Sequence, residues 1–355
     1  MPIENINNSF ITIFTLASFL IFLIALKISS YNYFKFFLDR DFIKPQAFHN
    51  KSTPRIGGLA SIIALALFIS FYNVIYYHSH FDYLYFSITF FILGFFDDVP
   101  ISLKPFTRLS IMILLLVIGF YLFEIKIEKT GFYFLNNLLE YSFFQYLFLI
   151  LCFLFIINGT NLTDGFNGLL AIHFILINSV LLYISLNNND DYFSLFLIGQ
   201  ILVIVCFLLF NFPKAKMFMG DGGAYLFGVV TSLNVINTSI SYPSISPLFF
   251  TTLLFYLFFE VFFSFIRKIK FKKSPLQPDS MHLHMLVFKY FDKIKGLKNS
   301  NPITSVIINF SFVLMVIPAL LFRENGLFCR YWFLIQLIIY LFIYLKFYNF
   351  TKKLN

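Results

Sequence analysis

The chain has 355 residues, of which 59% are hydrophobic and 12% are charged, and its mean hydropathy is +0.82. Soluble domains carry about 25% charged residues, so this composition excludes a soluble globular protein and indicates a polytopic membrane protein. The formal charge is +9. In a membrane protein, basic residues that set the orientation in the membrane are the first explanation for such a charge, ahead of an anionic partner. The three cysteines, Cys152, Cys206 and Cys329, lie in or beside apolar runs and lack metal-ligand spacing.

Long apolar runs follow one another along the chain, and a membrane-spanning helix needs about 20 mostly apolar residues. The first run lacks the basic segment of a signal peptide, so we interpret it as a retained span. Spans are predicted at residues 9–28, 57–77, 83–96, 106–124, 143–158, 168–186, 192–212, 222–240, 246–266, 303–322 and 327–346. The predicted fold class is therefore all-α, a single integral membrane domain over residues 1–355 with about eleven transmembrane helices, or ten.

The distribution of Lys and Arg predicts the orientation of these spans. Of the 26 basic residues, 22 fall on one side of the predicted membrane and 4 on the other. Basic residues concentrate in cytoplasmic loops, so the N-terminus is predicted outside and the C-terminus in the cytoplasm. The cytoplasmic loops are then those near residues 29–56, 97–108, 158–168, 212–222 and 267–302, and we expect them to form the active site.

The segment "FILGFFDDVPISLKPFTRLS" places Asp97 and Asp98 at the end of an apolar run, followed by Lys104 and Arg108. An ionised carboxylate in hydrocarbon costs several kcal/mol by most estimates, so such residues are rarely accidental. They are typical of a cation or phosphate site, because Mg²⁺ prefers carboxylates together with phosphate oxygens. The alternative is a solvated helix end whose basic side chains reach toward the membrane surface.

Two further polar motifs fall at predicted cytoplasmic helix ends. In "NGTNLTDGFNGLL", Asn158, Asn161 and Asp164 stand among glycines that let a ligand approach the backbone, although the same residue types also form ordinary turns. In "KAKMFMGDGGAYLFG", Asp221 precedes Gly222 at the start of a helix. Asp221 is either a helix cap or a metal ligand, and the two roles are compatible because a carboxylate has two oxygens.

The segment "SPLQPDSMHLHMLVF" contains His282 and His284, whose alternate spacing lets both meet one ligand only in a loop. Zinc is not expected, because no further His or Cys is near. Glu260, inside a predicted span, is a functional candidate by default. In "FHNKSTPRIGGLA", Lys51 and Arg55 form either a phosphate-facing loop or a membrane anchor, and on its own the segment favours the anchor.

In this order, the motifs resemble those of the polyprenyl-phosphate N-acetylhexosamine-1-phosphate transferases, of the bacterial glycosyltransferase family 4 type. The likeness rests on "TPRIGG", "LGFFDD", "NGTNLTDGFNGL", "FMGDGGAYLFG" and "PDSMHLHM" and extends roughly from His49 to Met285. It implies transfer of a sugar-1-phosphate from a UDP-N-acetylhexosamine, such as UDP-GlcNAc, to undecaprenyl or another polyprenyl phosphate, with release of UMP. It also implies Mg²⁺, or Mn²⁺, as cofactor.

The resemblance also assigns roles to individual residues. Asp221 is expected to bind the metal, with Asp98 as a second ligand, and Asp97 to activate or orient the lipid phosphate. Asp164 and Asn161, with Asn158, are expected to contact the nucleotide or take part in catalysis, so the catalytic set is Asp97, Asp98, Asp164 and Asp221. The expected diphosphate, sugar and phosphate contacts are His282, His284, Lys51, Lys104 and Arg108.

Three residues depart from the family pattern. Asn167 replaces a second Asp, Met285 replaces the last His, and Glu260 replaces a common Asp. The segment "PDSMHLHM" resembles that of enzymes in the synthesis of cell-surface glycans, of which lipopolysaccharide is one. The peptidoglycan-precursor branch instead has three consecutive histidines at this place. A peptidoglycan-precursor transferase, a membrane transporter and an inactive homologue are the alternatives. The expected location is the bacterial inner membrane, and no nucleic-acid partner is expected. The sequence does not decide whether the protein forms a homodimer.

Overall fold

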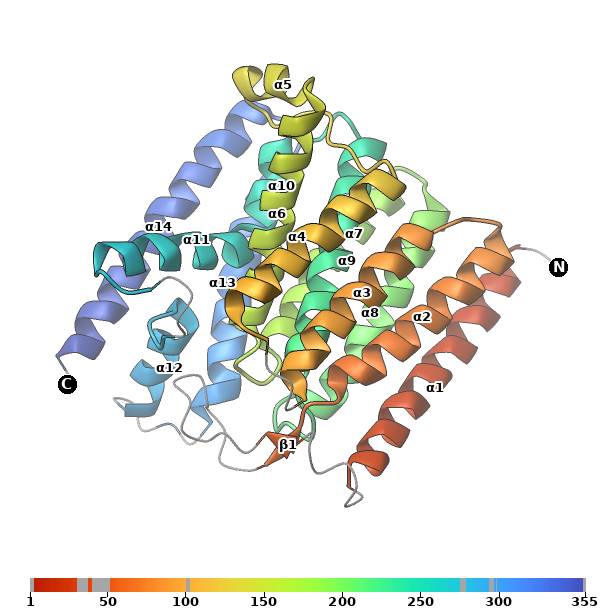
Figure 1. Ribbon diagram of the computed structural model, residues 1–355, viewed down its shortest axis with the longest axis horizontal. Helices are drawn as coiled ribbons and strands as arrows, with labels where there is room; N and C mark the ends of the chain where they lie inside the picture. The colour runs from red at the N-terminus through yellow and green to blue at the C-terminus, as the bar shows by residue number, and fades with distance from the viewer. Residues whose placement is uncertain are drawn as a thin grey trace. The chain divides into compact units, whose positions relative to one another are not determined.

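The computed structural model describes residues 3–30, 38–39, 52–99, 103–274, 279–293, 297 and 299–353, with the side chains of 3–7 left aside. Helices dominate these residues (Figure 1). Their bounds are α1 Ile3–Ser29, α2 Gly57–Tyr76, α3 Phe81–Asp98, α4 Pro105–Leu122, α5 Tyr133–Leu139, α6 Ser142–Thr163, α7 Leu169–Asn187, α8 Asp191–Asn211, α9 Gly220–Ser241, α10 Pro247–Leu253, α11 Phe255–Lys270, α12 Leu283–Lys293, α13 Ser300–Leu321 and α14 Gly326–Lys352. Two short strands, β1 Leu38–Asp39 and β2 Thr53–Pro54, pair antiparallel.

Every predicted span coincides with helix in the structure, which confirms a helical, multi-pass membrane protein. Within the described ranges, nine helices are long and apolar enough to cross a membrane, or up to ten if a bent pair counts as one span. Helix α3 is not among the nine, because its 18 residues carry Asp82, Asp97 and Asp98. The count of eleven and the predicted orientation of the termini stay predictions.

The predicted span at 246–266 is wrong as one straight helix, because α10 and α11 meet at an angle of 75°. The two faces of α11 provide the physical reason for this bend. Polar Glu260, Ser264 and Arg267 are buried on one face, whereas apolar side chains such as Phe262 and Ile266 are exposed on the other. The bend turns the polar face toward partners elsewhere in the chain, which a straight lipid-embedded helix would leave unsatisfied.

Two predicted loops also contain helix. The segment 267–302 includes the end of α11, all of α12 and the start of α13. In the segment 158–168, α6 continues to Thr163, so Asn158 and Asn161 stand on a helix. Length rules fail here because α12 is short and amphipathic and because α6 outlasts its apolar stretch.

The chain divides into two compact units. The first unit comprises Met1–Arg40, Lys51–Ile125 and Leu170–Thr238, and the second comprises Asp41–Asn50, Lys126–Leu169 and Ser239–Asn355. Each unit draws its helices from distant parts of the sequence. The expectation of a single domain stays a prediction.

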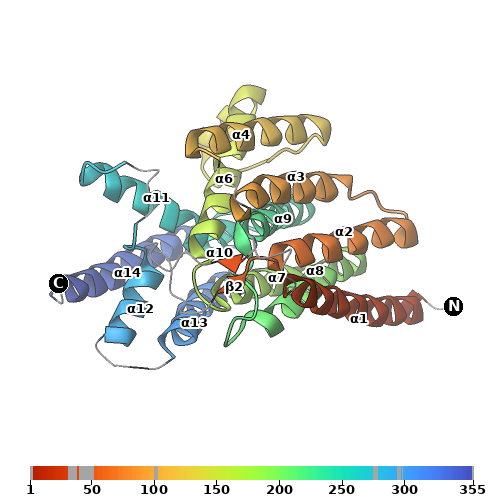
Figure 2. The same cartoon turned by 60° about the horizontal axis from the view of Figure 1, so that its bottom comes forward.

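In the first unit, α1, α2 and α8 lie side by side, and α3 packs between α2 and α4 (Figures 1 and 2). Its interior contains a polar group joining α7, α8 and α9. The Asn234 side-chain amide donates to Gln200 Oε1 (2.6 Å) and to Asn178 Oδ1 (3.1 Å), and all three residues are buried. Hydrogen bonds of this kind hold helices together where lipid supplies no hydrophobic driving force.

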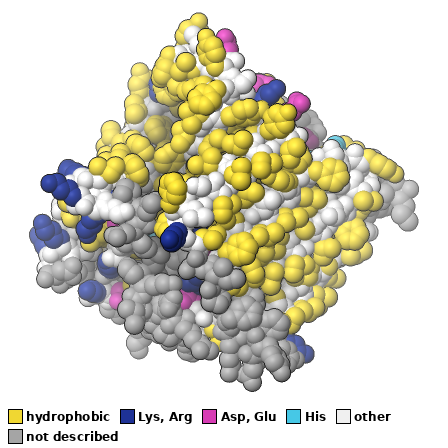
Figure 3. Space-filling model, viewed as in Figure 1, with side chains coloured by type: hydrophobic (Ala, Val, Ile, Leu, Met, Phe, Trp, Pro, Cys, Tyr) yellow, Lys and Arg dark blue, Asp and Glu magenta, His cyan; other side chains and the backbone are white. Residues whose placement is uncertain are grey.

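In the second unit, α6 packs on α11, and α12 contacts both α13 and α14 (Figure 2). The α6–α11 approach requires Gly159, because a Cβ there would stand 2.1 Å from the Leu257 carbonyl oxygen. Hydrophobic side chains cover the outward surface of α2–α4, whereas Lys and Arg gather over α11, α12 and the end of α14 (Figure 3). This surface is typical of a protein that meets lipid along its helices.

Candidate active site

In the first unit, the end of α3 is tied to the beginning of α9 by Asp98. One carboxylate oxygen of Asp98 accepts the backbone N–H of Asp221 and the other accepts the backbone N–H of Gly222, both at 2.9 Å. The first N–H groups of a helix have no partner within the helix, so Asp98 caps α9. The buried Asp98 carboxylate thereby fixes the position of Asp221 in the first turn.

Two glycines allow this close approach. Gly220 has a positive φ of 76°, and a Cβ there would lie 2.6 Å from the Asp98 carboxylate. A Cβ at Gly94, one turn before Asp98 on α3, would lie 2.5 Å from the Asp221 carbonyl oxygen. Glycine is the residue that accepts such a conformation and such a contact without steric cost. The "LGFFDD" and "MGDGG" motifs are therefore one packing unit as well as a charge cluster.

Two arginines face the carboxylates of this unit. The Arg55 guanidinium lies 2.7 Å from Asp39 and 3.8 Å from Asp98. Burial by itself lowers the pKa of Arg55, but the carboxylates of Asp221, Asp39 and Asp98 outweigh it and raise that pKa. Arg108 lies 2.5 Å from Asp97, which also accepts the Leu103 backbone N–H at 3.2 Å. Both guanidinium groups are thus permanent cations.

The weaker phosphate candidates are placed differently. Lys104 is exposed immediately before Pro105, the first residue of α4. Lys51 lies outside the described residues. Arg55, which the sequence favoured as an anchor, is instead held in the carboxylate cluster. The signal for this role is its position two residues before the glycine pair of "PRIGG".

The donor set fits a hard cation such as Mg²⁺. Asp98 and Asp221 lie close enough for their charges to act on each other, and carboxylate oxygens are suitable ligands. Across the ranges that the structure describes, no group of three or more His, Cys, Asp or Glu side chains is arranged to hold a metal. Mg²⁺ is commonly held by one or two carboxylates, with water and substrate phosphate completing its shell.

Replacing Asp98 with alanine is expected to destabilise the protein. The change leaves the buried N–H groups of Asp221 and Gly222 without acceptors, at a cost of about 1–3 kcal/mol each. The apparent Tm in detergent should fall by several degrees. Any activity that depends on Asp221 should fall as well, because Asp221 loses the group that holds it in position. An Asp98→Asn variant retains one acceptor oxygen and should lie between wild type and alanine, and equal Tm values for all three proteins would refute the capping role.

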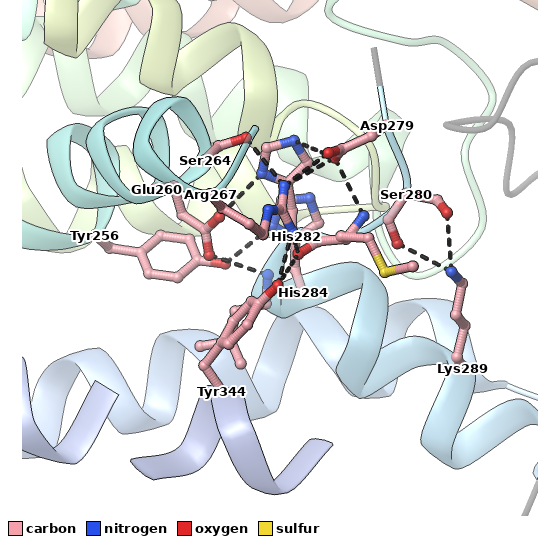
Figure 4. A network of polar contacts seen from close by, with 12 residues as sticks. Tyr256, Glu260, Ser264, Arg267, Asp279, Ser280, His282, His284, Lys289 and Tyr344 are labelled. Carbon is pink, nitrogen blue, oxygen red and sulfur yellow. Dashed lines mark hydrogen bonds and ion pairs between the residues drawn. The ribbon is translucent and has the colours of Figure 1, made fainter. Parts of the chain in front are cut away.

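The second unit contains a buried polar network around Glu260 (Figure 4). Glu260 Oε1 accepts hydrogen bonds from the Tyr340 hydroxyl (2.8 Å) and the Leu283 backbone N–H (3.1 Å), and Oε2 lies 3.0 Å from His282 Nδ1. The side chains of Glu260 and His282 are each only 1% exposed. Glu260 therefore fixes the ring orientation of His282 and the start of α12. The sequence alone did not indicate that His282 is the partner of Glu260.

Arg267, one helical turn from Ser264, holds the segment that leads into α12 (Figure 4). Its guanidinium donates to both carboxylate oxygens of Asp279 (2.8 and 3.1 Å) and also to the Met281 carbonyl and the Tyr344 hydroxyl. Lys289 on α12 binds Ser280 through its carbonyl (2.9 Å) and hydroxyl (3.0 Å). Several charge-assisted contacts therefore give this segment a defined conformation.

The two histidines lie with parallel rings, the centroids 5.6 Å apart and the planes at 3°. His282 precedes α12 and His284 is its second residue, so the expected loop placement is right for the first only. Within the described chain, the buried Nε2 atoms of both rings have no hydrogen-bond partner. His282 Nε2 lies 3.5 Å from Asp279, too far for a good hydrogen bond. Such unpaired buried atoms are consistent with ligand contacts.

Burial lowers the pKa of His284 to about 3, against the opposing field of Glu260. In the unfolded chain the pKa of a histidine is about 6.5. Above pH 6.5, His284 is therefore neutral in both states and does not affect stability. As pH falls from 6.5 toward 3, only the unfolded chain takes up the proton, so the folded state loses stability. Between pH 7.5 and pH 5 the apparent Tm of the wild type should fall more steeply than that of His284→Gln. The extra loss in the free energy of unfolding is up to about 1.4 kcal/mol per pH unit. Parallel Tm profiles for the two proteins would contradict this assignment.

The remaining predicted residues lie near the end of α6. Asn158 donates to the Leu154 carbonyl of its own helix at 2.7 Å. Asn161 is half-buried on the last turn, and Asp164 is the residue at which α6 ends. The backbone N–H of Asn167, which departs from the family pattern, donates to the Asn301 side chain at 2.8 Å. The structure thus gives this motif a helix end and a turn, and its nucleotide role stays a prediction.

Sequence reasoning missed several polar partners in both units. Tyr256, Tyr340 and Tyr344 contact His284, Glu260 and Arg267 respectively, yet each stands in an apolar run, and none of them was identified as a candidate from the sequence. Arg267 read as part of the positive-inside signal. The usable signal is a tyrosine in place of the much commoner phenylalanine, because a buried phenol generally requires a polar partner.

Together the fold and these charged groups define a multi-pass membrane protein with paired acidic and basic side chains at helix ends. The model of the glycosyl transferase family 4 matches residues 80–239, the segment that carries Asp97, Asp98, Asp164 and Asp221. By this segment, the chain is similar to the glycosyl transferase family 4.

The relatives carry two kinds of name. The undecaprenyl-phosphate alpha-N-acetylglucosaminyl 1-phosphate transferase of Thermotoga maritima is 26% identical over 261 residues, covering 74% of this chain and 76% of the relative. The probable undecaprenyl-phosphate N-acetylglucosaminyl 1-phosphate transferase of Bacillus subtilis is 26% identical over 66% of each chain. A phospho-N-acetylmuramoyl-pentapeptide-transferase of Clostridium perfringens is 32% identical over 186 residues, covering 50% of this chain and 58% of the relative.

Proposed function

We propose that this protein transfers N-acetylhexosamine-1-phosphate from a UDP-sugar to a polyprenyl phosphate such as undecaprenyl phosphate, releasing UMP. The observation that carries the proposal is the cluster of Asp97, Asp98 and Asp221 with Arg55 and Arg108 in the first unit. The names of the Thermotoga maritima and Bacillus subtilis relatives support the same reaction.

The chemistry requires both signs of charge. An oxygen of the lipid phosphate attacks the sugar-bearing phosphorus, and the P–O bond to the UMP phosphate breaks, so the bonding electrons leave with UMP. Two anionic substrates must approach each other, and Arg55 and Arg108 lower the electrostatic cost of that approach. Asp97, held by Arg108 and the Leu103 N–H, is the group that orients the attacking phosphate or takes up its proton.

Mg²⁺, with Mn²⁺ as an alternative, is the proposed cofactor. Asp221 is its principal ligand, because Asp98 already uses both carboxylate oxygens on backbone N–H groups. Asp98 is the second ligand, through lone pairs that those hydrogen bonds leave. When bound, the ion neutralises phosphate charge and polarises the phosphoryl group.

A second candidate is transfer of phospho-N-acetylmuramoyl-pentapeptide. The higher identity to the Clostridium perfringens relative, 32% over 186 residues, favours it. The sequence "HLHM" favours the N-acetylhexosamine substrate instead, because its histidines are separated and the third is replaced by Met285. The two candidates differ in the UDP-sugar and share the lipid acceptor.

The remaining parts of the proposal concern location. We place the protein in a bacterial inner membrane with the N-terminus outside, the C-terminus in the cytoplasm and the charged helix ends facing the cytoplasm. The excess of Lys and Arg on that side supports this orientation. A cytosolic nucleotide sugar and a membrane-embedded lipid phosphate meet at this surface, which begins cell-surface glycan synthesis.

The test is UMP release by purified protein in detergent with Mg²⁺ and undecaprenyl phosphate. Separate reactions contain UDP-GlcNAc, UDP-GalNAc or UDP-N-acetylmuramoyl-pentapeptide. UMP release with a UDP-N-acetylhexosamine supports the first candidate, and release only with the muramoyl substrate supports the second. Folded protein that releases no UMP from any of the three refutes the proposal.

A further inference from the structure

Tyr225 carries a hydroxyl that the fold does not use. The residue stands on α9, four residues after Asp221, so the two side chains share one face of the helix. Tyr225 is 0% exposed, and its hydroxyl has no hydrogen-bond partner among the residues that the structure describes. Burying a hydroxyl without a hydrogen-bond partner is unfavourable, so phenylalanine would suit an apolar position better. The hydroxyl therefore calls for an explanation.

The surroundings of Tyr225 are those of the charged cluster in the first unit. The Arg108 guanidinium carbon lies 6.0 Å from the Tyr225 ring centroid. The charges of Asp221, Arg108, Asp97 and Asp98 all act on the phenol. Arg108 makes one hydrogen bond within the described residues, through Nη1 to Asp97. The Tyr225 ring and the Arg108 guanidinium group, with its remaining N–H donors, therefore belong to the same cluster.

We propose that the Tyr225 hydroxyl donates a hydrogen bond to a phosphate oxygen of a bound substrate, beside Arg108. The proposal rests on the proposed function, which supplies two phosphate groups of the same chemistry, one on the lipid and one in the UDP-sugar. Arg108 attracts an anion to this point, and a hydrogen bond from a phenol to an ionised phosphate is stronger than one to a neutral acceptor. The carboxylates of the cluster are acceptors and serve the metal instead.

The hydroxyl is covered in the structure, so a substrate must displace a side chain to reach it. Arg108 is the group that moves, because its side chain is 26% exposed and its guanidinium group sits on a flexible stem. A phosphate competes with Asp97 for the guanidinium and brings its oxygen to the phenol as the side chain turns.

The test is Tyr225→Phe, which removes one oxygen atom and retains the ring. The KM for the substrate whose phosphate contacts Tyr225 should rise about tenfold, the change expected from one lost hydrogen bond to a charged group. The KM for the other substrate should stay within twofold, which distinguishes the lipid phosphate from the UDP-sugar. Without substrate, the apparent Tm should equal or exceed that of wild type, because the lost hydroxyl has no partner in the protein.

Tyr83→Phe is the matched control. Tyr83 is another buried tyrosine of the first unit, on α3, with its ring against His80 and Phe196 and far along the helix from Asp97. This variant should leave both KM values unchanged. Equal KM changes in the two variants, unchanged KM values in Tyr225→Phe, or failure of Tyr225→Phe to fold would each overturn the proposal.

A binding measurement separates this proposal from the proposed function. Each substrate is added alone, so that no transfer occurs, and the rise in apparent Tm at a fixed concentration is recorded. Tyr225→Phe should show a smaller rise than wild type with one of the two substrates. If the wild type transfers no sugar phosphate, the proposed reaction fails, and the Tm comparison still decides whether Tyr225 contacts a phosphate ligand.

Discussion

Replacing Asp221 with asparagine is expected to lower the transfer rate roughly a thousandfold, the scale expected when a group that stabilises phosphoryl charge is lost. The substitution retains size and shape and removes the negative charge from the first turn of α9. Asp98 cannot compensate fully, because both of its oxygens already accept backbone N–H groups. The measurement is UMP release at saturating substrate over a range of Mg²⁺ concentrations.

Asp191→Asn is the control for this prediction. Asp191 also stands in the first turn of a membrane-spanning helix, α8, but is exposed and apart from the charged cluster. Its loss should leave the rate and the apparent Tm near the wild-type values. Full activity in Asp221→Asn would remove the metal assignment and leave the similarity to the family intact.

Replacing Glu260 with alanine is expected to cause the largest loss of stability, about 3–5 kcal/mol. The change leaves His282 Nδ1, the Leu283 N–H and the Tyr340 hydroxyl unpaired inside the second unit. The apparent Tm should fall by roughly 6–20 °C, given about 2–4 °C per kcal/mol for medium-sized proteins. Activity should fall as well, because the His282 ring loses the group that orients it.

Two milder variants calibrate the Glu260 result. Tyr340→Phe removes one of the three hydrogen bonds and should cost about 1 kcal/mol. Glu260→Gln retains an acceptor for the Leu283 N–H but loses the charge beside His282, so it should lie between Tyr340→Phe and alanine. If Glu260→Ala unfolds no earlier than Tyr340→Phe, the network contributes little to stability and the interpretation is wrong.

The helical membrane fold could be predicted from sequence because hydrophobic length is a local property. For example, the spans predicted at residues 57–77 and 192–212 correspond closely to the observed helices α2, Gly57–Tyr76, and α8, Asp191–Asn211. The prediction failed at 246–266, where α11 buries Glu260 and Arg267 among residues distant in the chain. Apolar length does not reveal which face of a helix meets a polar partner.

The acidic residues of the candidate site could also be named from sequence, since a carboxylate beside an apolar run is costly unless it has a role. Asp97, Asp98 and Asp221 were identified in this way, and their motifs in order indicated the family. The separate roles of these three carboxylates could not be predicted from the sequence. That Asp98 caps the helix carrying Asp221, and that Arg55 approaches Asp98, depends on contacts between segments far apart in sequence.

Composition and motif order were sufficient for the class of protein, because hydrophobicity and residue type belong to each segment separately. The partner of each polar group was decided only by tertiary structure: Glu260 for His282, Arg267 for Asp279, and none within the described chain for the Tyr225 hydroxyl. A hydrogen bond depends on distances of about 3 Å between atoms, and only the folded chain sets such distances.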